Sequence, residues 1–87
     1  MPRAVGDPDS IRQLGRKVKQ TSDEMDKIAR ELLAALKATD WNDDVKRRFE
    51  HELTQLAGQV KAFRTQADNA ERYLQEKAKA LEAYLQS

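Results

Sequence analysis

The chain has 87 residues, of which 36% are charged, with 16 basic and 15 acidic side chains and no cysteine. This length limits it to a single domain, 1–87, and the lack of cysteine excludes disulfides and thiolate metal sites. The nearly balanced charge argues against a nucleic-acid-binding protein, which normally carries a strong basic excess. Small folds without disulfides or a metal usually gain stability by oligomerisation, and we expect that here.

The first helix is expected at about 8–39. Asp7 can cap its start, Pro8 suits the first helical position, and Asp9 favours the positive end of the helix dipole. Gly15 either permits a close approach by another helix or is a tolerated interruption. A ladder at strict heptad spacing follows, which is typical of a helix that packs along a neighbour. The ladder consists of Ile11, Leu14, Val18, Thr21, Met25, Ile28, Leu32, Ala35 and Thr39.

A short turn at 40–43 separates this helix from the next and holds the single tryptophan. Its recognition motif is Trp41, Asn42 and Asp43. Asn42 is the first choice for the N-cap of the second helix, with Asp40 second, because both residue types cap helices well. Trp41 is expected to plug the open end of the hairpin, to act as a recognition hot spot, or both.

The second helix is expected at about 43–85, with its own apolar seam. The seam reads Val45, Phe49, Leu53, Leu56, Val60, Phe63, Ala67, Ala70, Leu74, Ala78, Leu81 and Leu85. Folding back at the turn would place Ile11 opposite residue 71 or 72. The stripe from Tyr73 to Leu85 would then overhang without a partner in its own chain, which marks a binding surface or a segment that frays.

A wider apolar face near the turn suggests that the first helix has a second neighbour. Two hairpins packed face to face would supply it and form a four-helix bundle. The sequence therefore predicts an all-α fold, an antiparallel two-helix coiled-coil hairpin that dimerises. The candidate interface residues are Ala29, Leu33, Leu36, Phe49, Tyr73, Leu74, Leu81, Tyr84 and Leu85. The two tyrosines also admit a simpler role as surface aromatics.

Nothing in the sequence indicates catalysis, a cofactor or a metal. There is no glycine-rich phosphate loop and no pair of histidines at metal-ligand spacing, and His51 lacks an orienting partner. No apolar stretch approaches the ~20 residues of a membrane-spanning helix, and the first residues lack the apolar core of a signal peptide. We expect a chain made in the cytoplasm, without stable membrane insertion or nucleic-acid binding.

The whole pattern resembles the WXG100 family, the ESAT-6-like proteins of type VII secretion. The shared features are the length, two heptad helices around a central turn, and the start from Gly6 to Leu14. The Trp-x-Gly motif of the family would fall on Trp41-Asn42-Asp43, so Asp43 stands where the family has glycine. The aromatic residue found eight positions later in some members corresponds to Phe49. The Tyr-x-x-x-Asp/Glu tail motif is missing, because Lys77 follows Tyr73 at that spacing.

This resemblance implies a small dimeric protein that is exported folded, without a cleavable signal peptide, as a substrate or as a carrier. Its partners would be itself or a homologous hairpin, and a membrane-bound secretion ATPase would read the pair. The alternative is a cytoplasmic adaptor whose overhang from Tyr73 to Leu85 docks a helix of another protein. A hairpin acting on membranes or nucleic acid is a weaker third reading, because its charges are balanced.

Overall fold

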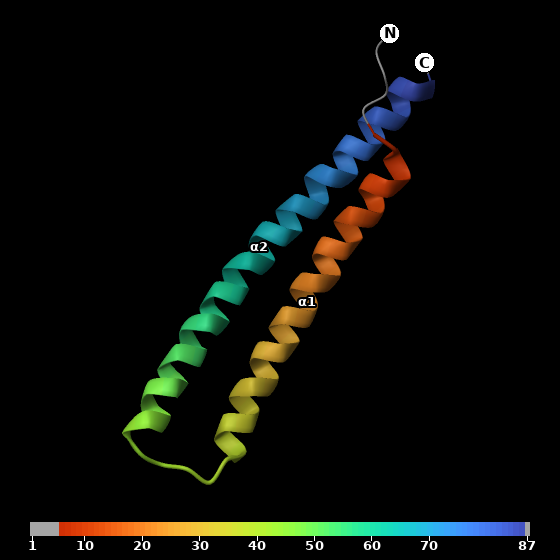
Figure 1. Ribbon diagram of the computed structural model, residues 1–87. Helices are drawn as coiled ribbons and strands as arrows, with labels where there is room; N and C mark the ends of the chain where they lie inside the picture. The colour runs from red at the N-terminus through yellow and green to blue at the C-terminus, as the bar shows by residue number, and fades with distance from the viewer. Residues whose placement is uncertain (1–5, 87) are drawn as a thin grey trace.

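The fold is an antiparallel hairpin of two long helices, seen in a computed structural model that describes residues 6–86 (Figure 1). Helix α1 spans Pro8–Ala38 and helix α2 spans Asp44–Gln86. Three of these four ends differ by one residue from the expected bounds. The molecule measures 66 × 18 × 16 Å, and its radius of gyration is 19.6 Å. A compact domain of this length would have a radius of about 12 Å, so both helices are largely open to solvent.

Aspartates cap the start of both helices. The Asp7 carboxylate accepts hydrogen bonds from the backbone N–H of Ser10 at 3.3 Å and from its hydroxyl at 2.8 Å, as the sequence predicts for α1. At α2 the prediction is wrong, because the cap is Asp43 and not Asn42 or Asp40. The Asp43 carboxylate accepts from the backbone N–H of Lys46 at 3.0 Å. Because no described non-glycine residue has a positive φ, the turn does not need glycine at this position.

The face that α1 turns toward α2 differs from the predicted ladder. The buried residues of α1 repeat every seven positions and are Pro8, Gly15, Ser22, Ala29 and Leu36. They pack against Leu53, Val60, Ala67, Ala78 and Leu81 of α2, all from the predicted seam of that helix. Several members of the ladder of α1 face solvent instead, among them Leu14, Ile28 and Leu32, which are 53%, 54% and 43% exposed.

The rotation of α1 follows from the size of its side chains. A Cβ added at Gly15 would lie 3.6 Å from Cβ of Leu74 and 3.2 Å from Nε2 of Gln75, so α2 passes close to this glycine. Small residues at Gly15, Ser22 and Ala29 make one face of α1 narrow enough for close helix packing. Of the two readings of Gly15, the close approach by another helix is therefore the one found here.

The predicted overhang at the C-terminal end is wrong as far as Leu81, because the apolar stripe up to that residue is covered. Arg12 pairs with Glu82, and Gly6 lies near Leu81, where an added Cβ would be 3.5 Å from a Leu81 methyl group. Ala78 is fully buried and Leu81 is 5% exposed. The linker from residue 39 to 43 lets α2 begin beyond the end of α1, and this offset shifts the register. Past Leu81, Tyr84 and Leu85 remain exposed, by 57% and 49%, so only the last turn of α2 matches the predicted overhang.

Candidate interaction surface

One face of the hairpin carries most of its exposed apolar side chains, and both helices contribute to it. We call this surface the apolar face. A groove of about 150 Å³ runs between the helices there and is lined by Met25, Ile28, Ala29, Leu32, Leu56 and Val60. The apolar face consists of Leu14, Val18, Met25, Ile28 and Leu32 from α1, and Val45, Phe49, Leu56, Phe63 and Ala70 from α2.

Along α2, the outward residues Phe49, Leu56, Phe63 and Ala70 recur every seven positions, as do the buried residues Leu53, Val60 and Ala67. Each helix thus has two neighbouring apolar stripes, one turned toward the other helix and one turned outward. A helix with two stripes requires two neighbours to bury them. The described residues supply only the first neighbour.

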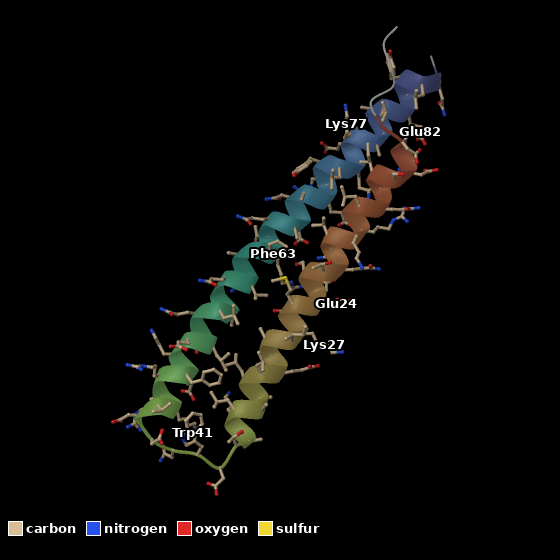
Figure 2. All side chains as sticks on the ribbon, viewed as in Figure 1. Glu24, Lys27, Trp41, Phe63, Lys77 and Glu82 are labelled. Atoms are coloured by element: carbon tan, nitrogen blue, oxygen red, sulfur yellow. The ribbon has the colours of Figure 1, made fainter. Side chains whose placement is uncertain are left out.

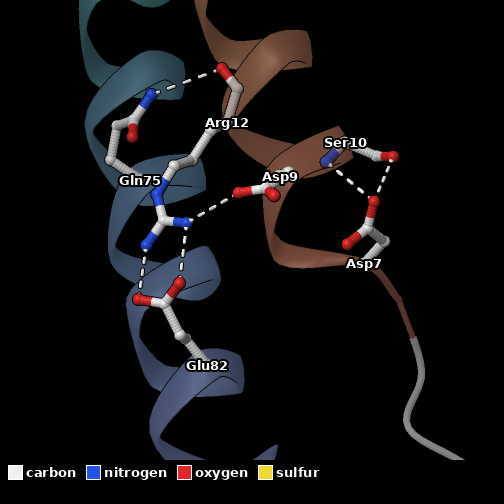
Figure 3. Close-up of polar contacts among 6 residues, drawn as sticks. All are labelled: Asp7, Asp9, Ser10, Arg12, Gln75 and Glu82. Carbon is white, nitrogen blue, oxygen red and sulfur yellow. Dashed lines mark hydrogen bonds and ion pairs between the residues drawn. The ribbon is translucent and has the colours of Figure 1, made fainter.

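The opposite flank of the hairpin is polar and pairs within the chain. Arg12 donates to both carboxylate oxygens of Glu82, at 3.1 and 2.9 Å, and Gln75 donates to the carbonyl of Arg12 at 3.4 Å (Figure 3). Lys19 pairs with Asp68 at 2.6 Å, and Arg64 reaches Asp23 and Asp26 at 3.4 Å. These ion pairs join α1 to α2 along the polar flank of the hairpin. No single sequence motif predicts them.

The ion pairs perturb the carboxylates that take part in them. The hydrogen bonds from Arg12 lower the pKa of Glu82, and the hydrogen bond from Lys19 lowers the pKa of Asp68. Both carboxylates thus stay ionised across the neutral range. A shallow groove of about 550 Å³ on this flank is lined by Lys19, Asp68, Glu71, Arg72, Gln75 and Glu76. Acidic and basic side chains lie side by side in this groove, so it favours neither an anionic nor a cationic ligand.

The middle of the helix interface contains an unsatisfied hydroxyl. Ser22 is fully buried, and its Oγ has no hydrogen-bond partner among the described residues. Nε of Arg64, close to it along the interface, is also buried without a partner. A buried polar group without a partner costs free energy, so Ser22 destabilises the contact between the helices at this point.

The turn motif forms a small structure of its own. Trp41 is half-buried, whereas Asn42 and Asp43 are exposed; Figure 2 shows the Trp41 side chain lying at the turn end of the hairpin. The backbone N–H of Lys46 and then the indole of Trp41 lower the pKa of Asp43. Asp43 therefore links the tryptophan to the first turn of α2.

The nine candidate interface residues fall into three groups. Ala29, Leu36 and Leu81 are buried within the chain, and Leu33 and Leu74 are half-buried. Four are exposed: Phe49 by 41%, Tyr73 by 61%, Tyr84 by 57% and Leu85 by 49%.

Sequence reasoning missed most of the α1 side of the apolar face, since it assigned Leu14, Met25, Ile28 and Leu32 to the contact within the hairpin. The signal that could have corrected this is the seven-residue repeat of small residues at Gly15, Ser22 and Ala29. This repeat lies one position after the ladder.

Three further observations bear on function. Within residues 6–86, no three His, Cys, Asp or Glu side chains lie close enough together to hold a metal ion. In the same part of the chain, neither helix is apolar enough over a sufficient length to cross a membrane. None of the protein families, curated proteins or solved structures compared with this chain matches it.

Proposed function

We propose that this protein is a non-enzymatic, WXG100-like helical hairpin that serves type VII secretion as an exported substrate or as a carrier for one. It acts through dimerisation, with itself or with a homologous hairpin, and a secretion ATPase reads the pair. The observation that carries the proposal is the apolar face, which both helices build and neither covers. The resemblance to the WXG100 family in length, in the helix–turn–helix arrangement and in the tryptophan at the turn suggests type VII secretion as the process that the protein serves.

The size of the exposed surface supports a binding role. The chain exposes 6881 Å², whereas a compact monomer of 10.0 kDa exposes about 5,200 Å². The excess of about 1,600 Å² in one chain is roughly twice the ~800 Å² that each partner of a standard protein–protein interface buries. A hairpin whose exposed surface includes a stripe of Leu, Ile, Met and Phe is suited to hold another hairpin.

The turn is suited to a recognition role because Asn42 and Asp43 are exposed and Asp43 links Trp41 to the first turn of α2. Asp43 replaces the family glycine, yet it caps α2 and contacts Trp41, so the substitution is compatible with the fold. The adaptor alternative relied on a free stripe between Tyr73 and Leu85. Since Ala78 and Leu81 are buried inside the hairpin, we do not propose that function.

Export in a host with a type VII system tests the proposal. We expect Trp41→Ala to reduce the secreted fraction severalfold while the helicity of the purified protein stays unchanged. Trp41→Phe is the matched control, since it keeps an aromatic ring at the turn. Unchanged export of Trp41→Ala would refute the signal role of the turn, and export without the secretion ATPase would refute the pathway.

A further inference from the structure

Met25 carries the only sulfur atom within residues 6–86. The chain has no cysteine and two methionines, and Met1 lies outside the described residues. Met25 is 38% exposed, so solvent and small solutes reach part of its side chain. Among the described residues, a peroxide can therefore oxidise sulfur at this position alone.

Met25 lies at the border between the apolar face and the contact of the two helices. It lines the groove of the apolar face together with Ala29 and Val60, which belong to that contact. Figure 2 shows this level of the hairpin, where it labels Glu24 on α1 and Phe63 on α2. A methionine side chain is unbranched and turns about three bonds, so its sulfur can face either the groove or the contact.

Two hydrogen-bond donors without an acceptor are buried at the same level. Ser22 is 0% exposed and its Oγ has no partner among the described residues, and Nε of Arg64 is likewise buried without one. Ser22 precedes Met25 by three residues, so their side chains are neighbours on the surface of α1. Arg64 is level with them, because it reaches Asp23 and Asp26 at 3.4 Å. Met25 lies between those two aspartates in the sequence.

Oxidation of Met25 would supply the acceptor that these donors lack. The lone pair of the thioether sulfur attacks one oxygen of hydrogen peroxide, so that an S–O bond forms and the O–O bond breaks. Sulfur is oxidised by two electrons, and the departing hydroxide takes the proton left on the transferred oxygen and becomes water. The product is a sulfoxide, whose polar oxygen accepts hydrogen bonds and donates none.

We infer that Met25 is an oxidation site and that its sulfoxide oxygen accepts a hydrogen bond from the Ser22 hydroxyl, with Nε of Arg64 as a second donor at that level. Oxidation of a packed methionine normally destabilises a fold, because it places a polar atom among apolar ones. Here the new oxygen satisfies a hydroxyl whose burial is already unfavourable. Peroxide thereby strengthens the contact between α1 and α2 at the point where Ser22 destabilises it.

A sulfoxide oxygen turned toward the groove has a different consequence. The other side chains that line the groove are aliphatic and donate no hydrogen bond; they are Ile28, Ala29, Leu32, Leu56 and Val60. An oxygen on that side meets only water, so its effect on stability does not depend on Ser22. The dependence of the oxidation effect on Ser22 therefore distinguishes the two orientations.

Thermal unfolding of the full chain before and after treatment with hydrogen peroxide tests the inference. Peptide mass spectrometry first locates one added oxygen at Met25. We expect the Tm shift caused by oxidation to be about 4 °C or more higher in the unchanged chain than in Ser22→Ala, as one hydrogen bond gives in a domain of this size. Methionine sulfoxide reductases supplied with a dithiol should return the Tm to its starting value.

Two matched variants accompany this measurement. Thr21→Ala removes an exposed hydroxyl four residues before Met25, so its Tm shift on oxidation should equal that of the unchanged chain. Met25→Leu should show no Tm shift with peroxide, which excludes effects of oxidation at Met1 or Trp41. A shift that depends on Thr21 and not on Ser22 would overturn the assigned hydrogen bond.

The remaining outcomes separate this inference from the proposed function, since it concerns the contact within one hairpin. Equal Tm shifts in the unchanged chain and in Ser22→Ala would show that the sulfoxide does not bind Ser22. If peroxide converts free methionine but leaves Met25 unmodified, the oxidation site itself is refuted. Neither result bears on the docking face, which export of Ile28→Lys tests: unchanged export of that variant would refute the docking face, whatever happens at Met25.

Discussion

Leu36 and Leu32 lie one helical turn apart on α1, and they test whether the outward rotation of the ladder is correct. Leu36 is 6% exposed in contact with α2, whereas Leu32 is 43% exposed on the apolar face. Truncating a buried leucine to alanine removes its transfer free energy and leaves a cavity, at a cost of about 2–5 kcal/mol. We expect Leu36→Ala to lower the free energy of unfolding by an amount near the lower end, because the interface of two helices collapses easily around a small cavity.

Leu32→Ala should behave differently. In the monomer it removes a side chain that solvent already reaches, so we expect a loss below about 1 kcal/mol. In the proposed dimer the same leucine would be covered, so we expect the loss to grow with protein concentration. Urea unfolding followed by circular dichroism, at protein concentrations from micromolar to hundreds of micromolar, separates the two effects. A larger loss for Leu32→Ala than for Leu36→Ala at the lowest concentration would contradict the observed rotation of α1.

Three further substitutions test the interior, the surface and the caps. Ser22→Ala removes a buried hydroxyl without a partner, so we expect a gain of about 1–3 kcal/mol in unfolding free energy, seen as a higher Tm; Thr65→Ala on the exposed side of α2 reports the gain in helix propensity alone. Gly58→Ala should raise the free energy of unfolding by up to ~1 kcal/mol, because alanine favours the helix and an added Cβ meets nothing within 4 Å. A lower free energy of unfolding in urea would mean that another group covers this site. Asp43 has a pKa lowered below its ordinary value of 3.8, so its contribution to stability is present above that value and is lost as the pH falls through the lower folded pKa. Asp43→Asn should therefore flatten the acid side of a pH titration of stability. An unchanged slope would show that the Asp43 cap does not cause the acid destabilisation.

The sequence predicted the hairpin well because both helices carry long heptad patterns and clear breaks. Asp7 and Pro8 mark the start of α1 unambiguously, and the acidic turn around Trp41 leaves one place for the chain to reverse. These signals are local, so neighbouring residues suffice to read them. The choice of cap at α2 was harder, since Asp40, Asn42 and Asp43 are equally good capping residues by type. Which of the three residues caps α2 depends on the position at which the helix begins after the linker.

The rotation of α1 could not be predicted by counting apolar residues. Heptad analysis assigns the largest side chains to the contact within the hairpin, yet the structure places Gly15, Ser22 and Ala29 there. Two opposing effects decide the matter: large side chains bury more area, whereas small ones let the helices approach and let Lys19 and Arg64 reach acids on the other helix. The stripe of small residues and the ladder of large ones on α1 are equally regular. Only their packing against α2 shows which of the two faces inward. The register shift likewise depends on a linker geometry that the sequence does not specify.

The division between the two stripes would link the folding of this protein to the proposed dimerisation. The contact between α1 and α2 is built from small residues and exposed ion pairs, which stabilise a fold weakly, and it contains the unsatisfied Ser22, which destabilises it. The larger side chains, such as Ile28, Leu32 and Phe49, gain burial only when another chain covers them. A partner that binds the folded hairpin and not the unfolded chain therefore adds its binding free energy to the stability of the fold. We expect the Tm to rise with protein concentration, and to lose that dependence when Ile28 is replaced by Lys; a Tm that is constant over a hundredfold range of concentration would show that the hairpin is stable alone.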